Sequence, residues 1–421
     1  MTPRGRGAGA LGVVLVLGLV LGLARRPVAP KPADAAAGDF SEARAMPVVE
    51  ALAGGLGPRP VGSPEAARAV ELLERRLRAL PGVEVVRQEV TGTWTVGGVV
   101  VYRVVNVLAR LAGERPDAVL LSAHYDSPAE SPGAADDGLG VAAGVEVMRA
   151  LAAGPRPRNT VVLNLNGGEE PGLLGAEGFL QHHPWARDVK VFINLEAVGS
   201  GGRAVLFRAG RDQRWLIDAY ASSVPHPTGS VLGQDLMGSG VVPLFTDFEK
   251  YASGLRQGVD MATLEDGYAY HTELDRPGRL APGTLQHLGD NTLALSRALA
   301  SHPLEPERSE PVGAFFDVLG VGMIVYSRGT AELWALLAVL LTAGAWGAAI
   351  HRGGVTLRGL MRGCAWTISC SAAASPGGWS PPGSIARYAA RKGPAITPRP
   401  GSCSAEIATP VTRFRRPAMM A

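Results

Sequence analysis

The sequence is poor in cysteine. Its three cysteines, Cys364, Cys370 and Cys403, all lie near the C-terminal end of the 421-residue chain. The rest of the chain therefore relies on neither disulfide bonds nor thiolate metal ligands. This cysteine usage permits an oxidising compartment without establishing one.

Net charge and aromatic content are also low. The chain carries a net charge of +3, and 6% of its residues are aromatic. Proteins that bind nucleic acid present a basic patch, often with aromatic side chains on which bases stack. No such patch of interleaved basic and aromatic residues stands out in the sequence. These numbers argue against nucleic acid as a partner.

Long apolar runs occur in only two places, and the first is at the N-terminus. Residues 8–24 carry no charge and have arginines on both sides. As a helix this run would rise about 25 Å, which is at the short limit for crossing a bilayer. We expect an uncleaved membrane anchor. A signal peptide cleaved near the "ADA" at 33–35 and a buried soluble helix are the open alternatives.

The second apolar run, residues 331–350, has a single charge at its edge and predicts a transmembrane helix. Arg352, Arg358 and Arg362 follow it. Because basic residues flank transmembrane helices on the cytoplasmic side, we expect the C-terminal end of this helix in the cytoplasm. Residues 25–330 are then expected to be extracytoplasmic, in a membrane-embedded protein.

Between the two runs, segments typical of strands and of helices alternate. The predicted strands are 83–90, 99–111, 118–123, 159–166, 189–195, 203–209 and 259–264. The predicted helices are 63–80, 140–153, 173–182, 214–223 and 282–300. This order predicts an α/β fold with a mixed, mostly parallel central sheet, helices on both faces and an antiparallel pair at one edge.

The chain is accordingly divided into six parts. They are an anchor or signal (1–24), a linker (25–44), the α/β domain (45–303), a second linker (304–330), the transmembrane helix (331–350) and a low-complexity tail (351–421). The tail is rich in Pro, Gly, Ser and Arg and has no apolar period, so we expect it to be disordered.

Polar side chains gather where the predicted strands end. His124 and Asp126 follow one strand, Glu169 and Glu170 another, Glu196 ends a third, and His271 follows a fourth. Asp136 lies in a Gly/Ala loop before a helix. Open α/β sheets bind ligands beyond the C-terminal ends of their strands. Histidine nitrogen and carboxylate oxygen are zinc ligands, and a site without cysteine suits catalysis better than structure.

Each motif alone has an ordinary interpretation: a surface His–Asp pair, a turn at "DDG", a solvated loop at "EE". Five such blocks in the same order and at the same spacing favour a catalytic metal site instead. "HYDS" (124–127), "GAADDG" (133–138), "NGGEEPGLLGAEGF", "INLEAVG" and "YHTELD" resemble the dizinc aminopeptidase family in order and spacing. That family includes bacterial leucyl aminopeptidases, glutamate carboxypeptidase II and the endoplasmic-reticulum metallopeptidases. The resemblance covers residues 45–300 and looks closest to the last, membrane-anchored branch.

The resemblance implies two Zn²⁺ per chain. His124 and Glu196 would hold the first zinc and Glu170 and His271 the second. The carboxylate of Asp136 would bridge them, and the peptide bond from Asp136 to Asp137 would be cis. Asp126 would hydrogen-bond the His124 ring. Glu169 would be the general base toward the water between the metals, and Tyr270 would stabilise the oxyanion or serve packing only. Relatives often carry Asp in place of Glu196.

The sequence therefore predicts a zinc exopeptidase with peptide substrates, and favours an aminopeptidase. A carboxypeptidase or glutaminyl cyclase on the same scaffold and a non-catalytic, receptor-like scaffold are the alternatives. Three further acids and histidines are interpreted as surface residues: His182, His183 and Asp247. Asp137 is expected to be a hydrogen-bonding loop residue. Oligomeric state and the preferred cleaved residue are left open.

Overall fold

The structure is a computed structural model. It describes residues 28–353 except 96–98, 211–212, 240–244, 255–256, 305–310 and 312, together with the six positions 12, 15, 16, 18, 19 and 22. The predicted N-terminal anchor, apart from those six positions, and the predicted disordered tail beyond residue 353 lie outside the described residues.

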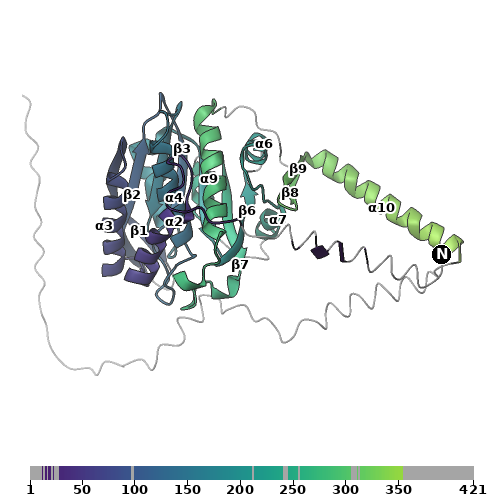
Figure 1. Ribbon diagram of the computed structural model, residues 1–421, viewed down its shortest axis with the longest axis horizontal. Coiled ribbons are helices and arrows are strands. Elements are labelled where there is room, and N and C mark those ends of the chain that lie inside the picture. Colours follow the sequence, from purple (N-terminus) through teal and green to yellow (C-terminus); the bar gives the residue numbers. More distant parts are fainter. Residues whose placement is uncertain are drawn as a thin grey trace, which may run out of the picture. The chain divides into compact units, whose positions relative to one another are not determined.

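A seven-stranded sheet forms the centre of the domain (Figure 1), in the order β1-β2-β4-β3-β5-β7-β6. The strands are β1 Val83–Thr95, β2 Val99–Leu111, β3 Arg115–His124, β4 Asn159–Asn166, β5 Val189–Ala197, β6 Gly201–Ala209 and β7 Gly258–Glu265. The four central strands β4, β3, β5 and β7 are parallel, whereas β2 and β6 pair antiparallel with their neighbours and β1 pairs antiparallel with β2. The predicted mixed α/β sheet and its antiparallel edge pair are confirmed.

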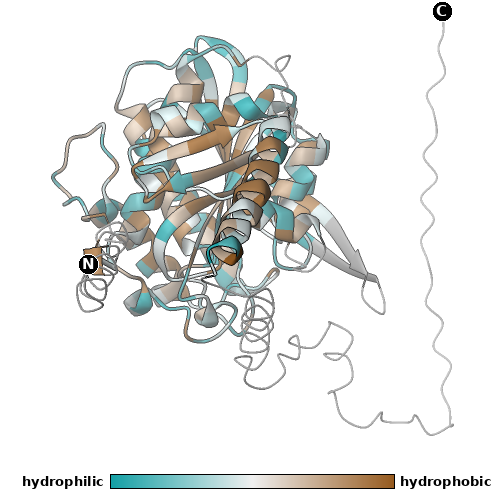
Figure 2. Ribbon diagram, turned by 90° about the vertical axis from the view of Figure 1, so that its right-hand side faces the viewer, coloured by the Kyte–Doolittle hydropathy of each residue, from teal (hydrophilic) through white to brown (hydrophobic). Residues whose placement is uncertain are grey.

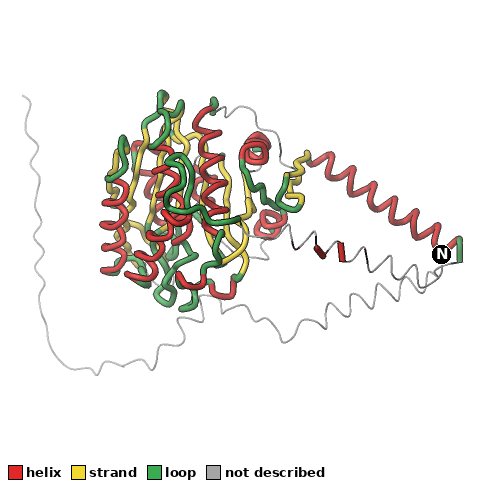
Figure 3. The backbone as a smooth tube through the Cα atoms, in the orientation of Figure 1, coloured by secondary structure: helices red, strands yellow, loops and turns green. Residues whose placement is uncertain are grey.

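Helices lie on both sides of this sheet (Figure 3). In chain order they are α2 Glu42–Val49, the π-helix η1 Glu50–Leu56, α3 Pro64–Arg78, α4 Gly138–Ala152, α5 Leu174–His182, η2 Pro184–Arg187, α6 Arg214–Ser223, α7 Leu232–Gly238, α8 Phe248–Gly254, η3 Gly267–Ala269, η4 Pro277–Arg279 and α9 Thr284–Ser301. Strand β3 shows why two layers form. Its Val119 and Leu121 pack into the core beneath α4 and α9, and the intervening Leu120 packs against α5 and α8 on the other face.

Local signals in the sequence explain where the helices begin. Ser63 caps α3 by accepting a hydrogen bond from the Ala66 N–H, and a proline occupies the first turn. The central strands are coloured as hydrophobic (Figure 2), as expected of parallel strands buried on both faces. The C-terminal ends of the parallel strands therefore lie at the edge of a buried apolar core.

Residues 304–330, predicted to be a linker, contain additional structure. Strands β8 (Ala314–Val318) and β9 (Gly322–Tyr326) form a hairpin, and Phe315 of β8 is fully buried in the main core. The prediction missed this hairpin because five-residue strands give too short an alternation to stand out. Likewise Phe40, placed in the first predicted linker, is fully buried in the core.

A long helix, α10 (Arg328–His351), follows the hairpin and covers the second apolar run. Its mean hydropathy is 2.0 over an 18-residue window, and none of that window is buried against other described residues. By length and composition it is the one helix among the described residues that could cross a membrane.

Candidate metal centre

The predicted ligands converge at one edge of the sheet. His124 is the last residue of β3, Glu169 and Glu170 follow β4, Glu196 lies near the end of β5, and His271 follows β7 and η3. Because β3, β4, β5 and β7 are parallel, their C-terminal ends meet on the same side. The strand order thus brings together residues that are up to 147 positions apart in the chain (124 to 271).

Asp136 lies at the middle of the cluster, with one carboxylate oxygen toward each histidine. Its Oδ1 is 3.2 Å from His124 Nε2, and its Oδ2 is 3.0 Å from His271 Nε2. Glu196 Oε2 is 3.7 Å from His124 Nε2, and Glu170 Oε2 is 3.2 Å from His271 Nε2. The five side chains therefore form two groups of nitrogen and oxygen donors that share Asp136. The Asp136–Asp137 peptide bond is cis, as predicted.

Burial makes this concentration of carboxylates unfavourable without a cation. Burial raises the pKa of Glu169 well above its usual range and that of Glu170 to about 7. Oε1 of Glu170 is buried and has no hydrogen-bond partner among the described residues. Donor atoms of His124, Asp136 and Glu170 lie within 4.8 Å of one another. The donor set and the unpartnered oxygen fit metal ions that accept both nitrogen and oxygen ligands.

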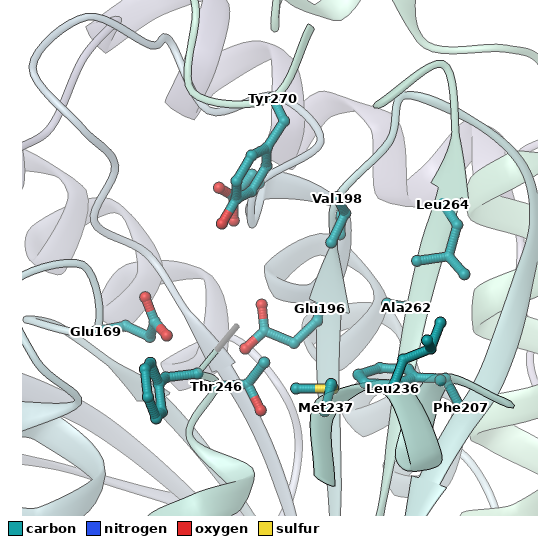
Figure 4. A pocket seen from close by; sticks show the side chains of 14 residues that line it. Glu169, Glu196, Val198, Phe207, Leu236, Met237, Thr246, Ala262, Leu264 and Tyr270 are labelled. Carbon is teal, nitrogen blue, oxygen red and sulfur yellow. The ribbon is translucent and has the colours of Figure 1, made fainter. Parts of the chain in front are cut away.

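A cavity opens beside this cluster (Figure 4). The carboxylates of Glu169 and Glu196 and the ring of Tyr270 line it together with Asp136, and the remaining wall is almost entirely apolar. The apolar lining residues are Ala197, Val198, Phe207, Leu236, Met237, Phe245, Ala262 and Leu264. Its volume is about 180 Å³. An apolar cavity of about 150 Å³ holds a benzene molecule, so this one has room for a single large apolar side chain.

Comparison with known proteins identifies the domain. Residues 106–296 match the sequence model of Peptidase family M28. The chain contains a peptidase family M28 domain.

Three similar proteins bear names that place them in membranes or in the endoplasmic reticulum. Endoplasmic reticulum metallopeptidase 1 from Rattus norvegicus is 36% identical over 330 residues, covering 73% of this chain and 37% of its own length. The Homo sapiens protein of that name is 34% identical over 77% of this chain and 39% of its own length. The vacuolar membrane protease of Yarrowia lipolytica is 36% identical over 52% of this chain and 22% of its own length. The chain thus spans little more than a third of the first two relatives.

Solved structures share the fold of the M28 domain. A zinc aminopeptidase from Bacillus subtilis superposes with a TM-score of 0.50 at 16% identity, covering 65% of this chain and 98% of its own. The glutaminyl cyclase of Fimbriiglobus ruber gives a TM-score of 0.50 at 18% identity, covering 65% of this chain and 99% of its own. The zinc exopeptidase-type fold expected from the sequence is confirmed.

Within the M28 domain, the contact between Asp126 and His124 differs from the expected one. The hydrogen-bond partner of His124 Nδ1 is the main-chain oxygen of Asp126, at 3.1 Å, while the Asp126 carboxylate lies 3.7 Å away. That carboxylate accepts hydrogen bonds from the backbone N–H groups of Glu169 and Glu170, at 3.3 and 3.4 Å. Asp126 therefore positions the two glutamates as well as the histidine.

Asp137 and Tyr270 occupy distinct positions at the site. Asp137 accepts hydrogen bonds from the backbone N–H groups of His124 and Gly140 and caps α4, in agreement with its interpretation as a loop hydrogen-bonder. Tyr270 stacks on the ring of His271, with ring centroids 3.8 Å apart. Burial and the neighbouring carboxylates raise the pKa of Tyr270, so its hydroxyl keeps its proton at neutral pH.

Asp247 corrects the sequence interpretation, because it is buried rather than on the surface. Its Oδ2 accepts a hydrogen bond of 2.5 Å from Asn166 Nδ2, and burial raises its pKa to about 8. The residue begins a segment leading into α8, which packs against the sheet. Its chain neighbours gave no periodic pattern from which burial could be predicted.

Two charged residues that the sequence did not single out hold the loop carrying Asp136. The fully buried guanidinium of Arg59 donates to the main-chain oxygens of Tyr125 (2.8 Å), Pro132 (2.5 Å) and Gly133 (3.1 Å). Asp275 accepts from the backbone N–H groups of Ala135 (2.7 Å) and Asp136 (3.1 Å). The only signal for Asp275 is its place four residues after His271, and Arg59 has none.

Proposed function

We propose that the M28 domain is a zinc-dependent aminopeptidase that removes apolar N-terminal residues from peptides. The observation that carries this proposal is the pair of donor groups sharing Asp136 beside an apolar cavity the size of one side chain. The family match supports a metallopeptidase. The apolar lining and the volume of the cavity support removal of an apolar residue.

In this proposal the chain binds two Zn²⁺. His124 and Glu196 would hold one ion and Glu170 and His271 the other, with Asp136 shared between the two groups. Zinc supplies Lewis-acid polarisation of the scissile carbonyl and activation of water. Asp126 keeps the His124 ring and the two glutamates in place through the hydrogen bonds described above.

Glu169 acts as the general base, and Tyr270 as an oxyanion donor. Glu169 reaches the same cavity as Glu196 (Figure 4), so its carboxylate can take a proton from a water at the scissile carbonyl and pass it to the leaving amine. The protonated hydroxyl of Tyr270 points into the cavity, where it can donate a hydrogen bond to the developing oxyanion.

The charge of the cavity favours an aminopeptidase over a carboxypeptidase. A carboxypeptidase needs a cationic group for the terminal carboxylate of its substrate. Among the described residues that line the cavity there is no Lys or Arg, and the charged ones are Asp136, Glu169 and Glu196. A cavity without such a side chain does not suit the terminal carboxylate of a carboxypeptidase substrate.

We further propose that α10 crosses the membrane and that the M28 domain is extracytoplasmic. The hydropathy of α10 and the names of the relatives support a membrane location. The arginines that follow α10 support the orientation. Reporter fusions at residues 200 and 365 test it: the fusion at 200 should behave as extracytoplasmic and the fusion at 365 as cytoplasmic. The reverse pattern would show the orientation to be wrong.

The catalytic proposal is tested by two adjacent substitutions. Glu170→Gln should lower zinc content and activity together, because Glu170 is a ligand. Glu169→Gln should keep near-normal zinc content and lose activity by about 10³–10⁴-fold, mainly in kcat, the upper end for a general base. The measurements are zinc analysis of both purified variants and steady-state kinetics on aminoacyl chromogenic substrates.

Three outcomes would contradict the proposal. Loss of zinc in Glu169→Gln with retention in Glu170→Gln would mean that the two roles are exchanged. Activity of Glu169→Gln within tenfold of the parent would remove it as the base. Faster cleavage of carboxy-terminal than of amino-terminal substrates, or cyclisation of N-terminal glutamine, would replace the aminopeptidase reaction by another on the same site.

A further inference from the structure

We propose that the outer face of hairpin β8–β9 rests on the surface of the lipid bilayer. This face, called the hairpin face below, consists of Phe316, Val318, Leu319, Val321 and Ile324. These five apolar side chains are all exposed, and Val321 at the turn is 86% exposed. An apolar patch of neighbouring side chains on a protein surface marks a site for a partner or a membrane.

The hairpin is firmly attached to the M28 domain by its opposite face. Phe315 is fully buried in the main core, and its main-chain oxygen accepts a hydrogen bond of 3.0 Å from the Val231 N–H. The Asp317 N–H donates to the Gly229 oxygen at 3.0 Å, and its carboxylate accepts from the Gly320 N–H at 2.8 Å. The hairpin face is therefore presented by a fixed element, and the one acid of the hairpin is occupied by backbone groups.

Strand alternation separates the two faces. Phe316 is paired with Ile324 and Val318 with Gly322 across the hairpin, so these side chains share the outer face. The rings of Phe316 and Tyr326 contact edge to face, with centroids 6.3 Å apart. Tryptophan and tyrosine, whose rings have a polar atom, are enriched where membrane proteins meet the headgroup layer, and Tyr326 is such a residue.

The position of α10, directly after the hairpin, indicates that the hairpin face contacts the lipid bilayer. Strand β9 ends at Tyr326 and α10 begins at Arg328. The apolar part of α10, 331–350, rises about 30 Å, the thickness of the hydrocarbon core, which sets Arg328 at the headgroup layer. Ile324 lies four residues before Arg328, a reach of about 13 Å in a strand. Because the link is so short, the hairpin face is held next to the bilayer surface.

The contact would fix the M28 domain relative to the membrane. Val231, which bonds to Phe315, directly precedes α7, and α7 supplies Leu236 and Met237 to the wall of the cavity. A hairpin seated on lipid would thus hold one wall of the substrate cavity at a set height above the bilayer. This inference rests on the proposed crossing of the membrane by α10, and the experiment separates the two.

The experiment measures depth in the bilayer with a fluorescent probe. In the full chain with Cys364, Cys370 and Cys403 replaced by serine, a single cysteine is introduced as Val321→Cys, Leu340→Cys or Gln181→Cys and labelled with an environment-sensitive dye. The chains are reconstituted at less than one per vesicle in phosphatidylcholine–phosphatidylglycerol vesicles that contain lipids spin-labelled at the headgroup or deep in the acyl chain. Val321 is suited to replacement because its side chain makes little contact with the protein.

Each position has its own expected result. The dye at 321 should be quenched by the headgroup spin label, the dye at 340 by the deep label, and the dye at 181, which is exposed on α5, by neither. All three chains should keep parent peptidase activity. Quenching at 340 with none at 321 would overturn the hairpin proposal alone. Absence of quenching at 340 would overturn the crossing by α10.

One further measurement separates lipid from protein. The dye at 321 is exposed to aqueous iodide in vesicles without spin labels. Shielding from iodide together with headgroup quenching supports lipid contact. Shielding from iodide without headgroup quenching would mean that protein covers the hairpin face, from another part of the chain or a second copy, and would refute the proposal.

Discussion

Arg208 on β6 provides the sharpest test of the packing behind the metal centre. Its side chain is buried, with its guanidinium 2.5 Å from Asp260 Oδ2 and 2.7 Å from Glu249 Oε1. Burial alone would lower the pKa of Arg208, but Asp260 and Glu249 raise it above its usual value. The other oxygen of Asp260 accepts a hydrogen bond of 3.1 Å from Asn194, which also donates to Glu196 at 3.2 Å. The ion pair therefore supports the strand that carries Glu196.

The substitution Arg208→Met keeps an unbranched side chain over the Phe248 ring and leaves the fully buried Asp260 without its cation. Removing one partner of a buried ion pair costs about 3–5 kcal/mol, because the other charge is left uncompensated. In a domain of this size each kcal/mol lowers Tm by roughly 2–4 °C, so we expect a fall of about 6–20 °C.

The measurement is thermal unfolding of the full chain in detergent with a chelator, so that metal binding does not contribute to stability. The matched control is Arg103→Met, since Arg103 forms an exposed pair with Glu89 and its loss should leave Tm unchanged. The double variant Arg208→Met/Asp260→Asn removes both charges and should recover much of the loss. A fall of less than about 3 °C for Arg208→Met, which is about 1 kcal/mol, would refute the reasoning. A double variant no more stable than the single one would assign the effect to lost packing.

Three further predictions concern acid sensitivity, packing and the cavity. Burial lowers the pKa of His287 to about 3, so below pH 6.5 the unfolded chain binds a proton that the folded chain does not, and stability falls by up to about 1.4 kcal/mol per pH unit. Tm of His287→Asn should therefore change less between pH 7 and 5.5 than that of the parent, and an equal change would contradict this. Gly289→Ala should lower Tm, because a Cβ there would lie 2.1 Å from the Phe40 ring. The expected loss in free energy of unfolding is about 1–3 kcal/mol. Gly278→Ala should leave Tm unchanged, because an added Cβ there would have no atom within 4 Å. Equal falls in Tm for the two variants would count against the packing argument. Ala262→Phe should raise KM for large apolar N-terminal residues more than for alanine, as measured on aminoacyl substrates, and a uniform change would show that the cavity does not hold the cleaved residue.

The sequence predicted the α/β sheet and the place of the predicted ligands because both depend on strong local patterns. The strands of the sheet centre are continuous apolar runs, and the polar residues directly follow them, so topology alone brings His124 and Glu170 to one edge. Short hairpin strands and buried acids lacked such patterns. Asp247 is buried by the packing of α8, a seven-residue helix whose position depends on contacts with strands far away in the chain.

Arg59 and Asp275 show a different limit of sequence-based prediction. Their partners are main-chain groups, which every residue carries, so no particular side chain elsewhere in the sequence points to them. Arg59 binds carbonyl oxygens on one side of the loop 125–136, and Asp275 binds N–H groups on the other. A chain without cysteine in this domain cannot fix a loop with disulfides or thiolate-bound metal. Here two buried side chains of opposite charge, each hydrogen-bonded to backbone groups, fix the loop that carries Asp136.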